Sequence, residues 1–305
     1  MTTYVAKRVG QGLLTILLST LVAFVLSHAT GDPVGVLTND YTSEEARQAL
    51  REELGLNRSL PEQYGIYLGN AVQGDFGESL VNKRPVMDLI TQRLPSTLML
   101  AGCAIAAGTA IGVPLGVVAA KRRGSMVDAG ARGLALLGQS TPVFVTGVLM
   151  IWTFSVTLGW LPTSGRSDWR SFVMPTFGLA WLVAAGVSRL IRSSMIEVLS
   201  QDFIVFSRVK GIGEGRVVWR HGLRNACLAM ITYLGIMLGT LLTGSVVVET
   251  LFAWPGVGRL AVTSVAARDF PVVQGLVIVF TVIFVAVNLV IDLSYSYLDP
   301  RISRT

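Results

Sequence analysis

Charged residues are scarce in this sequence. Only 14% of its 305 residues are charged, whereas a soluble globular domain has about 25%. The mean hydropathy is +0.59, too apolar for a water-soluble fold of this size, so the composition predicts a membrane protein. The net charge of +6 does not indicate a nucleic-acid partner, because the basic residues stand beside apolar runs.

Residues that carry metal or catalytic chemistry are equally few. The two cysteines, Cys103 and Cys227, lie inside apolar runs, which excludes a disulfide framework and gives no metal-site spacing. The two histidines, His28 and His221, are predicted to lie at opposite sides of the membrane, so they cannot share a metal ion. No Gly-Lys pair occurs, so the phosphate-binding loop GxxxxGK[ST] is absent, as is HExxH. Ser140 has no plausible histidine partner, and we expect a chain that is not an enzyme and holds no metal or cofactor.

Six apolar runs are long enough, or nearly so, to cross the bilayer as helices of about 20 residues. They are residues 9–31, 94–120, 133–165, 171–188, 225–248 and 270–291. The third run is too long for one straight span and is expected to end near Leu158, where GWLPTSG predicts a turn. The first run could instead be a signal peptide, because Lys7 and Arg8 precede it and SHA at 27–29 resembles a cleavage site. Its length and the five later runs favour a retained helix.

Basic residues in the loops predict the orientation. With a cytoplasmic N-terminus, fifteen basic residues lie in cytoplasmic segments and four lie in the short outer loops. Both termini are therefore predicted to be cytoplasmic. Residues 1–31 then form the N-terminus and first span, and 32–93 form an extracytoplasmic domain with short helices at 42–55 and 61–74. Residues 94–305 form the membrane core with the other five spans.

A few polar residues lie inside the predicted spans, where they are costly. Gln139, Ser140 and Thr141 precede Pro142 in the third run, and Asn288 lies in the last run. They are candidates for lining a transport pathway, and hydrogen bonding between helices is the alternative. Small residues that predict close helix packing recur in the second run at Gly102, Ala104, Ala106, Ala107, Gly108, Ala110 and Gly112.

The largest cytoplasmic loop is basic and rich in glycine: FSRVKGIGEGRVVWRHGLRNA, residues 206–226. Apolar residues at helical spacing lead into it, and glycines at 211–215 interrupt the helix. The pattern predicts helix, glycine turn and second short helix, which would present Val217, Trp219 and Arg220 outward. From the pattern alone, this surface fits either the groove of a soluble partner or anionic lipid headgroups.

This loop, extended to DFIVFSRVKGIGEGRVVWRHGLRNA, resembles the EAA loop of ATP-binding-cassette (ABC) importer permeases, in the form found in the dipeptide/oligopeptide/nickel branch. The matching positions are Asp202, Lys210, Gly211, Arg220, His221, Leu223, Arg224, Asn225 and Ala226. Phe203, Ser207 and Ile212 are mild departures. The likeness covers nearly the whole chain, including GVPLGVVAAKRRGSMVD (112–128) and VVVETLFAWPGVGRL (246–260), and its first span and outer domain resemble the first of the branch's two permease subunits.

The resemblance implies an all-α polytopic membrane protein of the type I ABC importer permease fold. It would have six transmembrane helices and a small helical extracytoplasmic domain after the first. It would form half of a pathway for di- and oligopeptides in a bacterial or archaeal cytoplasmic membrane. The implied partners are a second homologous permease subunit, two cytoplasmic ATPases that bind ATP and Mg²⁺, an extracytoplasmic binding protein and membrane lipid. Other cargoes of this branch are nickel chelates, glutathione and haem; a secondary transporter working without ATPases is the alternative from another class.

The resemblance also implies a coupling loop at 199–224, with a coupling helix at about 211–222 that contacts the ATPase. The implied contact residues are Asp202, Lys210, Gly211, Gly213, Glu214, Val217, Trp219, Arg220 and His221. The segment ETLFAWPGVGRL (249–260) is implied to re-enter the membrane between the fifth and sixth spans.

Overall fold

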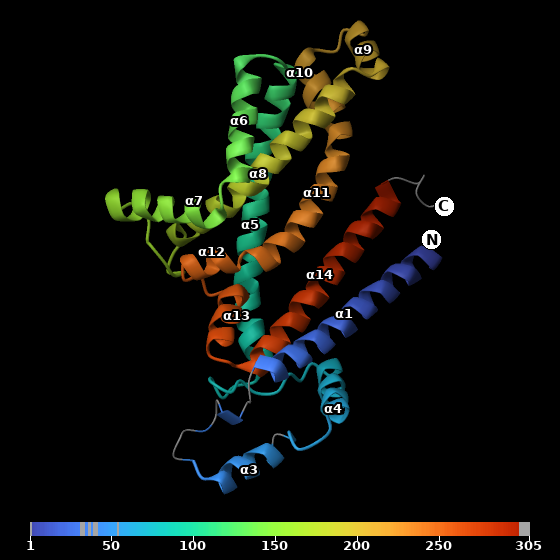
Figure 1. The fold of residues 1–305 in the computed structure, drawn as a ribbon. Helices are drawn as coiled ribbons and strands as arrows, with labels where there is room; N and C mark the ends of the chain where they lie inside the picture. The colour runs from blue at the N-terminus through green and yellow to red at the C-terminus, as the bar shows by residue number, and fades with distance from the viewer. Residues whose placement is uncertain (1, 31–33, 36–37, 39–41, 54, 299–305) are drawn as a thin grey trace. The chain divides into compact units, whose positions relative to one another are not determined.

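The computed structural model describes residues 2–30, 34–35, 38, 42–53 and 55–298. These residues are almost entirely helical, and an isolated bridge between Glu78 and Pro85 is the only β-type pairing recorded among them (Figure 1). The chain divides into two compact units, Met1–Pro95 with Gly256–Thr305 and Ser96–Pro255.

Helices that begin and end the chain form the first unit. They are α1 (Thr2–Thr30), α3 (Glu44–Glu53), α4 (Leu60–Val72), the start of α5 (Val86–Lys121), α13 (Val257–Ala266) and α14 (Phe270–Leu298). Helices α1 and α14 lie side by side (Figure 1). Gly12 permits this approach, since a Cβ added there would lie 2.6 Å from Cγ1 of Val285. A buried core joins the start of α5 to α13 and α14 through Val86, Leu89, Ile90, Val257, Leu260, Val272 and Leu276.

Polar side chains attach the outer segments of the first unit to its long helices. The Thr20 hydroxyl of α1 lies 2.9 Å from the hydroxyl of Tyr64 in α4, and His28 Nε2 lies 3.0 Å from Gln63 Oε1. Before α14, the buried carboxylate of Asp269 accepts hydrogen bonds from the Ser79 hydroxyl and the Leu80 backbone N–H. These bonds fix α4 against α1, and the loop before α5 against the start of α14.

The second unit holds the middle of the chain. Its elements are the rest of α5, α6 (Met126–Ser140), α7 (Val143–Met150), η1 (Ile151–Thr157), α8 (Arg170–Leu199), α9 (Asp202–Val209), α10 (Glu214–Arg216), η2 (Val217–Gly222), α11 (Leu223–Gly244) and α12 (Val246–Leu251). Helix α5 packs on α8 through Gly108, Gly112 and Gly116, where an added Cβ would lie 2.6–2.8 Å from backbone carbonyl oxygens of α8. The predicted close packing is thus confirmed at Gly108 and Gly112, whereas Gly102 has no atom within 4 Å of such a Cβ.

The third apolar run differs from its prediction as a span that continues to about Leu158. The chain breaks after Ser140, and Met126–Ser140 meets Val143–Thr157 at 100°. Thr141 is extended, with φ −84° and ψ 120°, because the following Pro142 disfavours helical backbone before it and has no N–H to donate. Within the described residues, four helices are long and apolar enough to cross a membrane, or up to six if each bent pair forms one span.

Two helices extend beyond the apolar runs in the sequence. Helix α5 begins at Val86 rather than at 94, because Val86, Leu89 and Ile90 belong to the buried core of the first unit. Helix α8 extends from Arg170 to Leu199, and so includes Arg189 and Arg192 after the apolar run 171–188.

Candidate functional site

The segment predicted to be the coupling loop, residues 199–224, is called the coupling loop below. It folds as helix, glycine turn and helix, which confirms the pattern predicted from its sequence. Helix α9 ends at Val209, and Gly211 takes the left-handed conformation with φ +76°. Residues that carry a side chain rarely adopt that φ, so glycine is the residue suited to this turn. Gly213 then caps α10, and the chain continues through η2 into α11 without a non-helical residue.

An ion pair closes the glycine turn. Arg208 Nε and Nη2 donate hydrogen bonds of 3.1 and 3.0 Å to the two carboxylate oxygens of Glu214. Both side chains are more than 40% exposed, so the pair stabilises the turn by less than about 1 kcal/mol.

The apolar anchors of the coupling loop point into the chain. Ile204, Val217 and Val218 are at most 1% exposed. The expectation that Val217 faces a partner is therefore wrong, because η2 turns this side chain into the second unit's own core. Trp219 is 48% exposed and Arg220 is also exposed, so these two of the three expected contact residues do lie on the surface.

Helix α9 exposes an apolar surface that sequence reasoning missed. Val205, Phe206 and Val209 are 50–79% exposed. The Lys210 ammonium lies 4.4 Å from the centroid of the Phe206 ring, a cation–π distance. The spacing of Val205 and Val209, one helical turn apart, indicates an apolar face on this helix. It does not show whether that face is buried by the rest of the chain or exposed.

The other predicted contact residues are exposed or half-buried. Asp202 is exposed in the first turn of α9, and Gly213 and Glu214 are exposed at the start of α10. His221 is half-buried in η2, where its carbonyl accepts a hydrogen bond from the Asn225 side chain at 2.8 Å.

The pathway candidates are divided between the two units. Gln139 and Ser140 are exposed at the end of α6, and Thr141 is half-buried at the break that follows. They belong to the second unit, whereas Asn288 belongs to α14 of the first. Asn288 donates a 2.8 Å hydrogen bond to the carbonyl of Phe284 in its own helix.

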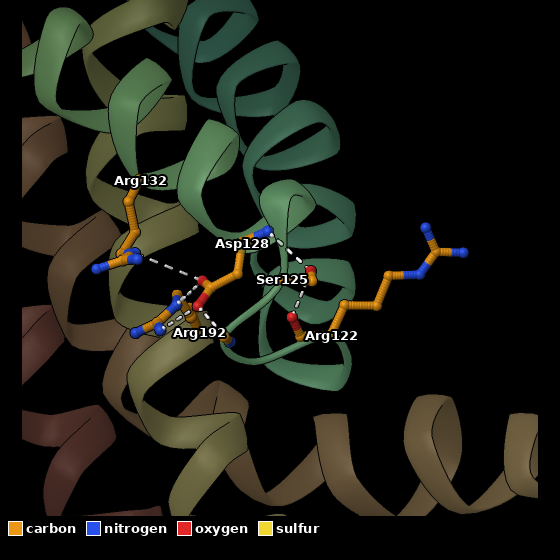
Figure 2. Close-up of polar contacts among 6 residues, drawn as sticks. Arg122, Ser125, Asp128, Arg132 and Arg192 are labelled. Carbon is orange, nitrogen blue, oxygen red and sulfur yellow. Dashed lines mark hydrogen bonds and ion pairs between the residues drawn. The ribbon is translucent and has the colours of Figure 1, made fainter.

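A buried carboxylate organises the other end of α6, and sequence reasoning missed it. Asp128 is 1% exposed and accepts hydrogen bonds from Arg192 of α8 at 2.5 and 2.8 Å and from the Gly124 backbone at 3.0 Å. Figure 2 shows Arg132 and Arg192 converging on this carboxylate, with Arg132 Nε at 3.7 Å. Ser125 caps α6 by accepting from the Asp128 N–H. The available signal was a lone acid within the basic stretch KRRGSMVDAGAR.

A second buried carboxylate fixes α12. Glu249 is fully buried and accepts hydrogen bonds from the hydroxyls of Thr97 (2.6 Å) and Ser245 (3.0 Å). Past the end of α12, the backbone N–H of Trp254 donates to the Glu249 carbonyl, and its indole N–H donates to the carbonyl of Ser96 at 3.1 Å. Irregular backbone is tolerated at membrane depth when it is buried in protein in this way, as the re-entrant expectation for this segment requires.

Comparison with known proteins identifies the family of the chain. A family model described as "Binding-protein-dependent transport system inner membrane component" matches residues 112–304, and the model of the corresponding N-terminal part matches residues 1–101. This chain belongs to that family of importer permeases.

Relatives of the permease match it from end to end. It is 40% identical over 303 residues to the glutathione transport system permease protein GsiC of Escherichia coli K12, with 99% of each chain covered. It is 39% identical over 303 residues to the protein of the same name from Shigella flexneri serotype 5b, again with 99% of each covered.

Two solved structures share the fold of the permease at 20% identity. One is an amino acid ABC transporter with histidines, with a TM-score of 0.51 over 68% of this chain and 92% of that one. The other is the MetNI methionine ABC transporter in an inward-facing conformation, with a TM-score of 0.52 over 68% and 96%. The chain is thus a membrane-embedded subunit of a bacterial ABC importer, a class that works with ATPase subunits and a binding protein.

Proposed function

We propose that this permease imports small peptides, with the tripeptide glutathione as the first candidate cargo. The observation that supports this cargo is the 40% identity to a glutathione permease along 99% of both chains. Other di- and oligopeptides are the second candidate, because the motifs of the coupling loop belong to the whole peptide and nickel branch. Nickel chelates and haem are alternatives with less support.

The coupling loop is the proposed contact for a cytoplasmic ATPase. Its exposed Phe206, Val209 and Trp219 offer apolar anchors, and Lys210 and Arg220 offer positive charge beside them. Buried Val217 serves a different purpose, because it ties the contact surface to the second unit's core. Since η2 continues directly into α11, displacement of this surface by ATP binding would be passed to a membrane helix.

The pathway is proposed to lie between this permease and a second, homologous subunit, and ATP hydrolysis is proposed to occur on two ATPase partners. Gln139, Ser140 and Thr141 at the break after α6, and Asn288 in α14, stay candidates for its lining. Their polar groups lie in or beside helices that are otherwise apolar, which supports this role.

Uptake into reconstituted vesicles tests the transport proposal. Vesicles that hold both permease subunits and both ATPases should accumulate labelled glutathione from its binding protein only when ATP is supplied inside. Omitting the ATPases should abolish uptake; unchanged uptake would mean a secondary transporter. An unlabelled dipeptide should compete poorly with labelled glutathione if glutathione is the cargo. Competition stronger than that of unlabelled glutathione would reassign the cargo to other peptides.

The outer domain, residues 32–93, is proposed to be extracytoplasmic and to contact the binding protein, with both termini in the cytoplasm. Val72 at the end of α4 is 82% exposed and Val209 in the coupling loop is 79% exposed. In a background without Cys103 and Cys227, an impermeant thiol reagent added to intact cells should label Val72→Cys. It should label Val209→Cys only after permeabilisation, and the reverse pattern would invert the orientation.

A further inference from the structure

A groove of about 410 Å³ runs between α6 and α8, outside the coupling loop and apart from the proposed pathway contacts except at Gln139. Ala131, Ala135 and Leu136 of α6 supply its apolar wall. Its lining extends along α6 from Ala131 to Gln139 and along α8 from Ser188 to Arg192. The charge distribution of the chain places the basic residues among them near the cytoplasmic surface.

Three arginines face this groove: Arg132 from α6, and Arg189 and Arg192 from α8. Arg192 is held by the buried Asp128 carboxylate, and Arg132 lies 3.7 Å from the same carboxylate (Figure 2). No ion pair joins Arg189 to an acid within the described part of the chain. With one carboxylate against three guanidinium groups, the groove keeps two unneutralised positive charges at the edge of a membrane.

The surface beside the groove is made of leucines. Leu136, in the wall itself, is 67% exposed, and the neighbouring Leu137 is 60% exposed. A soluble anion would leave this apolar wall in contact with water, whereas a molecule with a phosphate head and an acyl chain would satisfy both parts. Basic pockets between membrane helices on the cytoplasmic side bind anionic headgroups in this way, and a guanidinium matches phosphate oxygens through paired N–H donors.

We propose that the groove between α6 and α8 binds an anionic phospholipid, with its phosphate on Arg132 and Arg189 and an acyl chain along Leu136. Arg192 also faces the groove, but its hydrogen bonds to Asp128 give it a structural role. The proposal needs the chain to be a membrane permease and is independent of its cargo.

The test uses the full-length permease purified with its partner subunits, and a double variant, Arg132→Gln with Arg189→Gln. Arg123→Gln is the matched control, because Arg123 is an exposed basic residue of the adjoining loop that does not line the groove. Native mass spectrometry counts retained phosphatidylglycerol, and titration in nanodiscs compares phosphatidylglycerol with phosphatidylcholine. Thermal unfolding in phosphatidylcholine should stay cooperative and close to that of the wild type for all variants, which shows that the double variant is folded.

We expect the wild type and Arg123→Gln to retain phosphatidylglycerol, and the double variant to bind it about thirtyfold more weakly, from the usual contribution of two basic residues at an anionic surface. Inorganic phosphate should not displace the lipid. Equal retention by the double variant, equal loss in Arg123→Gln, or equal binding of phosphatidylcholine would overturn the proposal. Displacement by inorganic phosphate would instead identify a soluble phosphate site, and loss of the second permease subunit with lipid retained would identify a subunit contact; either result rejects the lipid.

Discussion

The buried carboxylate of Asp128 is predicted to be a main anchor of the second unit. Asp128→Asn keeps the size of the side chain but removes its charge, so that Arg192 loses its counterion. Breaking a buried ion pair by removing one partner costs about 3–5 kcal/mol. Because the Arg192 side chain is 22% exposed, water can partly replace the carboxylate, and we expect the lower end of that range, about 3 kcal/mol.

A double-mutant cycle isolates the pair from other effects of the substitutions. The free energy of unfolding is measured in mixed micelles for the wild type, Asp128→Asn, Arg192→Gln and the double variant. Residues in direct contact show coupling energies of about 0.5–3 kcal/mol, and the two short hydrogen bonds here place the expectation near the top of that range. Arg132→Gln is the matched control: its guanidinium lies 3.7 Å from the same carboxylate and its side chain is 60% exposed, so its loss should cost under about 1 kcal/mol.

Two results would refute this reasoning. If Arg132→Gln destabilised the protein as much as Asp128→Asn, the carboxylate would have no preferred partner, contrary to its geometry in Figure 2. If the cycle gave no coupling energy, the hydrogen bonds between α6 and α8 would not contribute to stability.

Three further predictions concern the glycines and the coupling loop. Gly112→Ala should lower the free energy of unfolding by about 1–3 kcal/mol, since its Cβ would lie 2.7 Å from a carbonyl oxygen of α8; Gly102→Ala, with nothing within 4 Å, should not destabilise the protein in the same assay. Gly211→Ala should cost about 1 kcal/mol, because φ is +76° there, and an unchanged unfolding free energy would contradict the left-handed turn. Arg220→Glu should leave membrane insertion and ATP hydrolysis intact while uptake falls about tenfold or more, whereas Arg224→Glu, the control, should transport normally; equal uptake by both variants would remove Arg220 from the ATPase contact.

Patterns that depend on neighbouring residues predicted much of this fold. Apolar runs locate the long helices, and the glycines near 211 locate the turn of the coupling loop, because helix formation and interruption are local properties. The break at Pro142 could be anticipated as a kink, but its 100° angle could not. That angle depends on what α7 packs against, which includes α12 about one hundred residues later in the chain.

Burial of single side chains was harder to predict. Val217 lies at helical spacing in a short exposed loop, and that pattern is the same whether the side chain faces a partner or its own chain. The carboxylates of Asp128 and Glu249 are buried by partners 64 and 152 residues away. A sequence pattern of one or two helical turns contains no information about such partners, so it does not predict that either acid is buried.

The anchors of the second unit suggest how the permease could combine stiffness with movement. Glycines such as Gly112 let its long helices pack directly on the backbone of a neighbouring helix. Buried carboxylates, as at Asp128 and Glu249, hold its irregular segments. The outer face of α9 has neither kind of anchor. The turn after it is closed by backbone hydrogen bonds, such as that from the Gly211 N–H to the Arg208 carbonyl, and by the exposed pair of Arg208 and Glu214. Exposed ion pairs contribute little, so this turn can change shape without breaking a buried carboxylate contact. A surface that must follow an ATPase while η2 and α11 stay helical would be expected to have this construction.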